Sequence, residues 1–109
     1  MVPIKPSPRV ALMRWLAQLH YNAIRNIESV FENVTRSDGS LTRGTALRGF
    51  QIADDLVLTR KRTFYKIVGN QAVPISVEEV SANYNLEALQ AKYRAAVDAW
   101  KNIQRNRRR

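Results

Sequence analysis

Basic side chains gather in two places along this sequence and are the groups best suited to binding chemistry. The run Arg60-Lys61-Arg62 precedes a pair of aromatic residues, and four of the last five residues are arginines. A guanidinium matches phosphate geometry with two parallel hydrogen bonds, so such clusters are typical of surfaces that bind polyanions. The cations that we expect to contact a polyanion are Arg60, Lys61, Arg62, Lys66, Lys101, Arg105, Arg107, Arg108 and Arg109.

Phe64 and Tyr65 follow the first cluster, and this arrangement has two interpretations. On a nucleic-acid surface, arginines hold phosphates while aromatic rings stack on bases. In a folded core the two rings are buried instead, and the cations line an exposed edge strand, where charge prevents pairing with another sheet. We expect the rings to be buried and the cations to contact a polyanion.

The terminal arginines also have two interpretations. One or two cations there would complement the partial negative charge at the C-terminus of a helix. Four arginines exceed that need and favour a tail that binds a polyanion. The chain has 18 lysines and arginines against 9 acidic residues, a net charge of +9. Such a charge most often indicates a nucleic-acid partner, with a merely soluble basic protein as the plainer alternative.

No residue pattern indicates catalysis, a cofactor or a metal. His20 is the only histidine, and the sequence has no cysteine. The adjacent carboxylates at 54–55 and 78–79 diverge, so neither pair suits joint acid–base work or the clamping of one metal ion. The sequence also has no glycine-rich phosphate loop and no nucleophile motif. We therefore expect a protein that is not an enzyme, with no cofactor and no metal site.

A long helix over residues 8–35 is the first element that the sequence predicts. Ser7 is a hydroxyl N-cap, and Pro8 suits the first helical position. Apolar residues then recur at steps of three and four, the spacing of one helical face. They are Leu12, Leu16, Leu19, Ala23, Ile27, Val30 and Val34. Before this helix, the prolines of residues 1–7 predict an extended arm.

An amphipathic helix is predicted over residues 86–105, with a basic tail at 105–109. Two interleaved heptad rows define its apolar face. The members of that face are Leu86, Leu89, Tyr93, Ala96, Trp100 and Ile103. We expect the face to pack against the first helix, and the rows leave open an assembly face for other subunits or a homo-oligomeric seam.

The segment FYKIVGNQAVPI between these helices predicts a β-hairpin with Gly69-Asn70 as its two-residue turn. The expected register pairs Phe64 with Ile75, Tyr65 with Pro74, Lys66 with Val73, Ile67 with Ala72 and Val68 with Gln71. Ser76 and Glu79 then form a capping box, so a short helix should begin at Val77.

A competing prediction uses part of the same segment. Residues 52–68, IADDLVLTRKRTFYKIV, resemble a helix-turn-helix with TFYK, residues 63–66, in its recognition helix. The run 63–74 is also similar to excisionase-type DNA-binding domains, which carry a comparable threonine-aromatic-tyrosine-basic stretch. Val57 stands where the turn usually has glycine, and one added residue in the turn would rotate the second helix by about 100°. We favour the hairpin.

These elements predict a mainly α fold with a small β-hairpin (α+β). The long N-terminal helix and the C-terminal amphipathic helix would pack together, with the hairpin and short helices between them, as a single helical domain over residues 8–104. The function that this favours is a non-enzymatic structural or accessory protein of a nucleoprotein assembly, ribosomal or viral in kind. Its partners would be RNA or DNA and other protein subunits. The alternatives are a helix-turn-helix regulator and a pure protein-assembly subunit.

The sequence gives little information on location. The most apolar run, VALMRWLAQL, is interrupted by Arg14, which argues against a membrane span and a secretory signal. The residues before Glu28 include no acid, as in a mitochondrial presequence, but the prolines at their start favour native structure. We expect no membrane partner and an intracellular or particle-associated protein.

Overall fold

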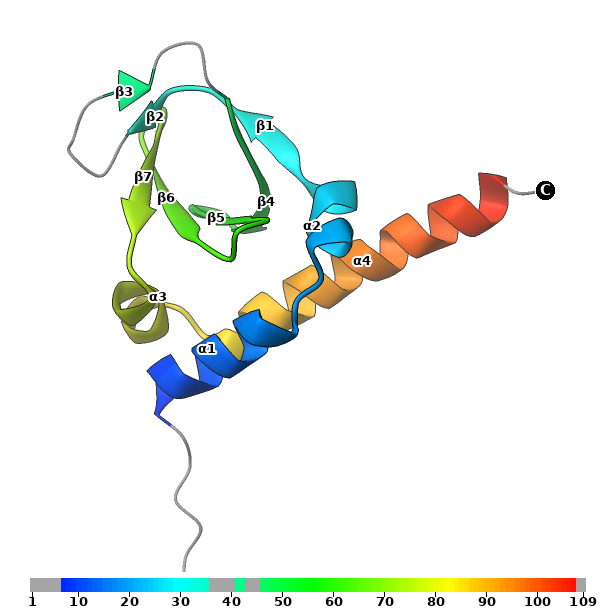
Figure 1. The fold of residues 1–109 in the computed structure, drawn as a ribbon, viewed down its shortest axis with the longest axis horizontal. Helices are drawn as coiled ribbons and strands as arrows, with labels where there is room; N and C mark the ends of the chain where they lie inside the picture. The colour runs from blue at the N-terminus through cyan, green and yellow to red at the C-terminus, as the bar shows by residue number, and fades with distance from the viewer. Residues whose placement is uncertain (1–6, 36–40, 43–45, 108–109) are drawn as a thin grey trace, which may run out of the picture.

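A curled sheet and a set of helices form the two parts of the molecule (Figure 1). The computed structural model describes residues 7–35, 41–42 and 46–107. The helices are α1 (Pro8–Gln18), α2 (Tyr21–Ile27), α3 (Val77–Asn83) and α4 (Leu86–Arg107). The strands are β1 (Ser29–Phe31), β2 (Val34–Thr35), β3 (Leu41–Thr42), β4 (Leu47–Ala53), β5 (Leu56–Thr59), β6 (Phe64–Val68) and β7 (Gln71–Ile75).

The predicted fold class is therefore wrong. The fold is not two long helices around one small hairpin, because a mixed sheet of seven strands is a major part of the body. The predicted arm, apart from Ser7, lies outside the described residues, and so do Arg108 and Arg109.

The predicted helix over residues 8–35 is broken at Leu19 and His20. Ser7 caps α1 as predicted, its Oγ accepting a backbone N–H at 3.2 Å. Leu19 and His20 then have extended backbone conformations. Because of this break, Leu19 and Ile24 both reach the core, where each is buried. The residues after α2 form strands, as their β-branched and aromatic side chains prefer.

The segment after α2 closes a four-stranded meander into a ring. Strands β4 to β7 pair in antiparallel order, with an irregular register between Gln51 and Ala53. At one edge β1 pairs antiparallel with β4, and at the other β2 pairs parallel with β7 through Val34 and Ala72. Asn33, between β1 and β2, has a left-handed φ of 55°, which asparagine tolerates better than most residues. Figure 1 shows this segment arching across the ring.

The hairpin of β6 and β7 confirms the predicted register. All of the expected pairs are present, from Phe64 opposite Ile75 to Val68 opposite Gln71. Gly69 in the turn has a φ of 60°, a conformation that glycine adopts without a steric penalty. The local turn chemistry was thus sufficient to predict this part of the sheet.

The helix that follows the hairpin is also confirmed. The Ser76 hydroxyl accepts the Glu79 N–H at 3.2 Å, and α3 begins at Val77. Residues 52–68, by contrast, form the end of β4, all of β5 and β6 and the turns between them. The helix-turn-helix prediction is therefore wrong.

The sheet has one face toward the helices and one face toward the inside of the ring. Leu56, Leu58 and Phe64 lie on the face toward the helices, which we call the outer face. They pack in one cluster with residues of all four described helices and with Leu19, which lies between α1 and α2; the helical members include Leu12, Leu16, Ile24, Val80 and Leu89. Side chains alternate along a strand, so Val57 and Tyr65, which are paired, lie on the opposite or inner face.

The predicted C-terminal helix is confirmed as α4, which continues to Arg107. It packs on α2 and β4, and it contacts α1 through the apolar cluster and an aromatic pair. Tyr93 forms that pair edge-to-face with Trp15, at 5.8 Å between ring centroids, and a second one with Phe50 at 6.4 Å. Beyond α2, the last turns of α4 run away from the rest of the body (Figure 1).

Candidate nucleic-acid interface

Arg60, the first cation of the central cluster, is bound within the protein. Its Nε donates to Glu28 Oε2 at 2.7 Å, and its terminal nitrogens donate to Glu28 Oε1 and, at 2.9 Å, to the Tyr21 hydroxyl. The guanidinium lies 5.3 Å from the centroid of the Tyr21 ring, within cation–π range. The hydrogen bonds to Glu28 and then Tyr21 raise the pKa of Arg60 above its ordinary value. Since Glu28 supplies the opposite charge, Arg60 has few donors left for a phosphate.

Arg62 also forms a hydrogen bond within the protein. One of its terminal nitrogens donates to the Leu19 carbonyl at 3.0 Å, just after α1, where the helix dipole favours a cation. Arg62 has a φ of 63°, which is uncommon outside glycine. Thr59 and Thr63 close the turn that holds it, with their hydroxyls 2.6 Å apart. Arg62 therefore caps α1 from the β5–β6 turn.

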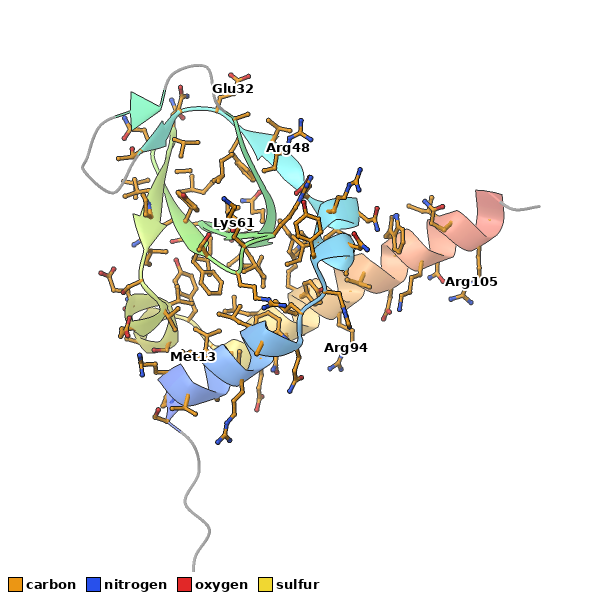
Figure 2. The ribbon with its side chains drawn as sticks, in the orientation of Figure 1. Met13, Glu32, Arg48, Lys61, Arg94 and Arg105 are labelled. Carbon is orange, nitrogen blue, oxygen red and sulfur yellow. The ribbon has the colours of Figure 1, made fainter. Side chains whose placement is uncertain are left out.

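Lys61 and Lys66 are both exposed but lie in different places. Lys66 follows Tyr65 in β6, so its side chain lies on the outer face of the sheet. Lys61 lies in the β5–β6 turn, and Figure 2 places it inside the outline of the ring. The cluster of four cations that the sequence suggested is thus divided: two cations are bound internally, one lies on the outer face, and one lies at the ring.

A groove of about 360 Å³ opens beside Lys61, where the ends of strands β4, β5 and β6 meet the start of α2. Its cationic lining residues are Arg48, Arg60 and Lys61, and its aromatic ones are Tyr21 and Tyr65. None of the described residues that line it is acidic. We call this feature the ring groove.

A second basic feature runs along α4. Arg94, Lys101 and Arg105 are separated by seven and four residues, which puts them on one side of the helix. All three are exposed, and Figure 2 shows Arg94 and Arg105 leaving α4 on the same side. Asp98 adjoins them, and the exposed Lys92 lies on the opposite side of the helix by the same spacing. We call Arg94, Lys101 and Arg105 the basic row.

The predicted assembly face is largely occupied within the chain. Leu89 is buried, and Leu86, Tyr93 and Ala96 pack against the same core. Trp100 is half-buried, whereas Ile103 remains 53% exposed near the end of α4. Only the C-terminal end of this face is available to another molecule.

Sequence reasoning missed Arg48, Tyr21 and Arg94 as candidate site residues. Arg94 could have been recognised from the sequence, because residues seven and eleven positions apart, as Arg94 is from Lys101 and Arg105, lie on the same side of a helix. No such signal exists for Tyr21 and Arg48, since only the folded sheet brings them to the β5–β6 turn.

No family model, curated protein or solved structure matches this chain, so its function has to be inferred from geometry. None of the described helices has both the length and the apolar composition that a membrane crossing requires. Within residues 7–35, 41–42 and 46–107, no three His, Cys, Asp or Glu side chains are grouped to hold a metal ion.

Proposed function

We propose that this chain is a non-enzymatic structural or accessory protein of a nucleoprotein assembly, and that the basic row contacts nucleic acid. The observation that carries the proposal is the row itself: three exposed cations on one side of α4. Arg94 and Lys101 line a hollow between α4 and the end of α1, and Arg105 lies farther along the helix, toward its projecting end. A projecting helix can approach a duplex or a folded RNA without a clash from the sheet.

The dimensions of the row suit a phosphate backbone. From Arg94 to Arg105 the helix rises about 16 Å, since each residue adds about 1.5 Å. That length corresponds to about five base-pair steps of a duplex. The sequence continues after the row with three more arginines, Arg107, Arg108 and Arg109.

The test is the salt dependence of nucleic-acid affinity, measured by fluorescence anisotropy with a labelled duplex and a labelled single strand. The variant Arg94→Gln/Lys101→Gln/Arg105→Gln should bind more weakly than the parent. The slope of log affinity against log salt should fall by about 0.9 for each duplex phosphate that the variant no longer neutralises, and by about 0.7 for each phosphate of a single strand. All three side chains are exposed, so the circular dichroism spectrum should not change.

Lys92→Gln is the matched control, because it removes one exposed cation from the opposite side of α4. It should leave the slope nearly unchanged, since Lys92 is outside the row. Equal losses of affinity in Lys92→Gln and in each single variant of the row would show that only total charge matters. A triple variant that keeps the parental affinity and slope would contradict the proposal.

The exposure of Ile103 favours a second candidate, a protein-assembly subunit that binds an acidic partner protein. With the half-buried Trp100, Ile103 forms a small apolar end on the projecting part of α4. This candidate predicts that Ile103→Glu prevents assembly with the partner from the native source, while nuclease treatment of the complex has no effect. Disassembly by nuclease would instead support the nucleoprotein proposal.

A further inference from the structure

The ring groove is distinct from the basic row in both position and lining. It is at the end of the inner face of the sheet, whereas the row follows α4. Lys61 and Arg48 both line the groove, and Figure 2 shows Lys61 within the ring outline and Arg48 outside it beside β1. A volume of about 360 Å³ is in the range of sites that hold one small organic group.

The charge of the groove favours an anionic ligand. Glu28 neutralises Arg60, which leaves Lys61 and Arg48 as the uncompensated lining charges. In the part of the chain that the structure describes, neither of them has an ion pair. Two other hollows differ in their charges: the one between α1 and α4 has Asp98 between its two cations, Arg94 and Lys101, and the one beside β1 includes Glu32 without a described cation.

The wall of the groove is held in place before any ligand arrives. Arg60 ties the Tyr21 hydroxyl to Glu28 through charge-assisted hydrogen bonds, so α2 is fixed to the β5–β6 turn. On the other side, the Thr63 N–H and hydroxyl both contact the Thr59 hydroxyl. A site whose side chains are already ordered loses less conformational entropy on binding.

Tyr65 is an aromatic lining residue of the groove. It is half-buried on the inner face, with its backbone fixed opposite Val57 and Pro74 in the sheet. One ring next to two free cations is the combination by which proteins bind single strands, with the base on the ring and the phosphates on the cations. A base within a duplex is already stacked on its neighbours and cannot make this contact.

We propose that the ring groove binds one nucleotide of a single-stranded nucleic acid. The base stacks on the Tyr65 ring, Lys61 contacts the phosphate next to that base, and Arg48 contacts a neighbouring phosphate at the rim. This inference rests on the proposed function, since both require a nucleic-acid partner, but it assigns a second site with a preference for single strands.

The experiment measures affinity by fluorescence anisotropy for labelled oligo(U) and oligo(dT) of about 15 nucleotides, a length within the range that a small single-strand site covers. A duplex of the same length is the comparison. Tyr65→Leu should weaken single-strand binding by about 5- to 150-fold, which is the measured range for removing one base–aromatic stack. Duplex affinity should change little. Tyr65→Phe keeps the ring and should retain single-strand affinity.

The cations give an independent measurement that does not disturb the sheet. Lys61→Gln and Arg48→Gln change exposed residues, and each should reduce the single-strand salt slope by about 0.7. Lys66→Gln is the matched control, because Lys66 is an exposed lysine on the outer face of the same sheet. Its slope should equal that of the parent.

The outcomes separate the two proposals. If the parent binds neither single strands nor duplex, the proposed function fails, and this inference fails with it. If the parent binds single strands and Lys61→Gln, Arg48→Gln and folded Tyr65→Leu all keep the parental affinity, only the groove inference is overturned. If Tyr65→Leu does not fold, the single-strand affinities and salt slopes of Lys61→Gln and Arg48→Gln decide whether the groove inference holds. Binding to either oligo(U) or oligo(dT) supports the site, and a comparison of oligo(U) with oligo(dU), which differ only in the sugar, shows whether the site prefers ribose or deoxyribose.

Discussion

Three consecutive cations, Arg60, Lys61 and Arg62, have three different roles in this structure. Arg60 is paired with Glu28, Arg62 donates to the Leu19 carbonyl, and Lys61 is exposed at the ring groove. Their neighbours in space, not their neighbours in sequence, decide which charge is available to a ligand. A basic run is therefore a poor measure of binding capacity until the internal partners of each side chain are known.

At the same scale, Gly49 is required by the close approach of two strands. A Cβ at this position would lie 2.6 Å from Val57 Cγ1 and 2.9 Å from the Leu58 carbonyl oxygen. Gly49→Ala should lower the free energy of unfolding by about 1–3 kcal/mol, as overpacking of a filled core does. Urea denaturation followed by circular dichroism measures this change.

Gly69→Asn is the control for the first glycine variant. Gly69 has nothing within 4 Å of its added Cβ, and asparagine tolerates its left-handed φ. This variant should stay within about 0.5 kcal/mol of the parent, as surface substitutions usually do. A Gly49→Ala protein as stable as Gly69→Asn would show that β4 and β5 can separate at no cost.

At the scale of elements, a side chain of the β5–β6 turn contacts the break between α1 and α2. The end of α1 leaves carbonyl groups without helical partners, and Arg62 donates to one of them. Arg62 itself has a left-handed φ of 63° in the β5–β6 turn. One arginine thus connects the end of a helix to the geometry of a hairpin.

Two substitutions separate the effect of the hydrogen bond to Leu19 from the effect of the left-handed backbone at residue 62. Arg62→Ala loses the hydrogen bond to Leu19 and keeps a Cβ in the left-handed conformation, whereas Arg62→Gly loses the bond but removes that strain. Both should be less stable than the parent, and Arg62→Gly should exceed Arg62→Ala by about 1 kcal/mol in unfolding free energy. Chemical denaturation provides the comparison. Equal stability of the two variants would mean that the turn stores no backbone strain.

At the scale of the whole molecule, the sheet and the helices are joined by the apolar cluster and by a few polar contacts. The Tyr84 hydroxyl, between α3 and α4, donates to Asp55 Oδ1 at 2.9 Å in the turn between β4 and β5. Burial, together with this hydrogen bond, raises the pKa of Tyr84 to about 12. At the surface, Arg9 of α1 donates to Glu78 of α3 at 2.7 Å and lowers the pKa of that carboxyl.

The contact of Tyr84 predicts a loss of stability at alkaline pH. In the unfolded chain Tyr84 ionises near pH 10, and in the folded protein near pH 12. Its contribution is therefore fully present below pH 10 and is lost as the pH rises toward 12, because the unfolded state releases its proton first. Tyr84→Phe should be less stable than the parent by about 1 kcal/mol at pH 8. That difference should shrink above pH 10 in thermal melts.

The pH dependence of the parent is compared directly with that of Tyr84→Phe. A parent and a Tyr84→Phe variant with parallel stability curves from pH 8 to 12 would show that the sheet–helix contact does not depend on the proton of Tyr84.

Local rules predicted only part of the fold from the sequence. The Ser7 cap, the Gly69 turn and the Ser76 cap are each determined within a few residues, and all three were predicted correctly. Val30 and Val34 are four residues apart, which fits a helical face as well as one side of a strand, so the predicted helix extended wrongly over β1 and β2. Strand β5 is buried on both faces and shows no alternation, so periodicity could not identify it.

The candidate site was predictable to a similar extent. Lys61, Lys101 and Arg105 are exposed cations in the structure, and their availability to nucleic acid stays a prediction. The internal partners of Arg60 and Arg62 come from residues more than thirty positions away in sequence. No local pattern could anticipate those pairs, because they depend on the break after α1 and on the closure of the ring.

The arch formed by β1 and β2 imposes an order on folding. Strands β6 and β7 form a hairpin from adjacent residues, and such hairpins form in about 1–10 μs. Val34 of β2, by contrast, needs Ala72 of β7, so the ring cannot close before the whole meander has been made. During synthesis β1 and β2 leave the ribosome before β4 and β7, the strands that they pair with. Until then the edges of β1 and β2 are unpaired and can aggregate. The earliest strands of this sheet to be synthesised are thus the last to find all of their partners.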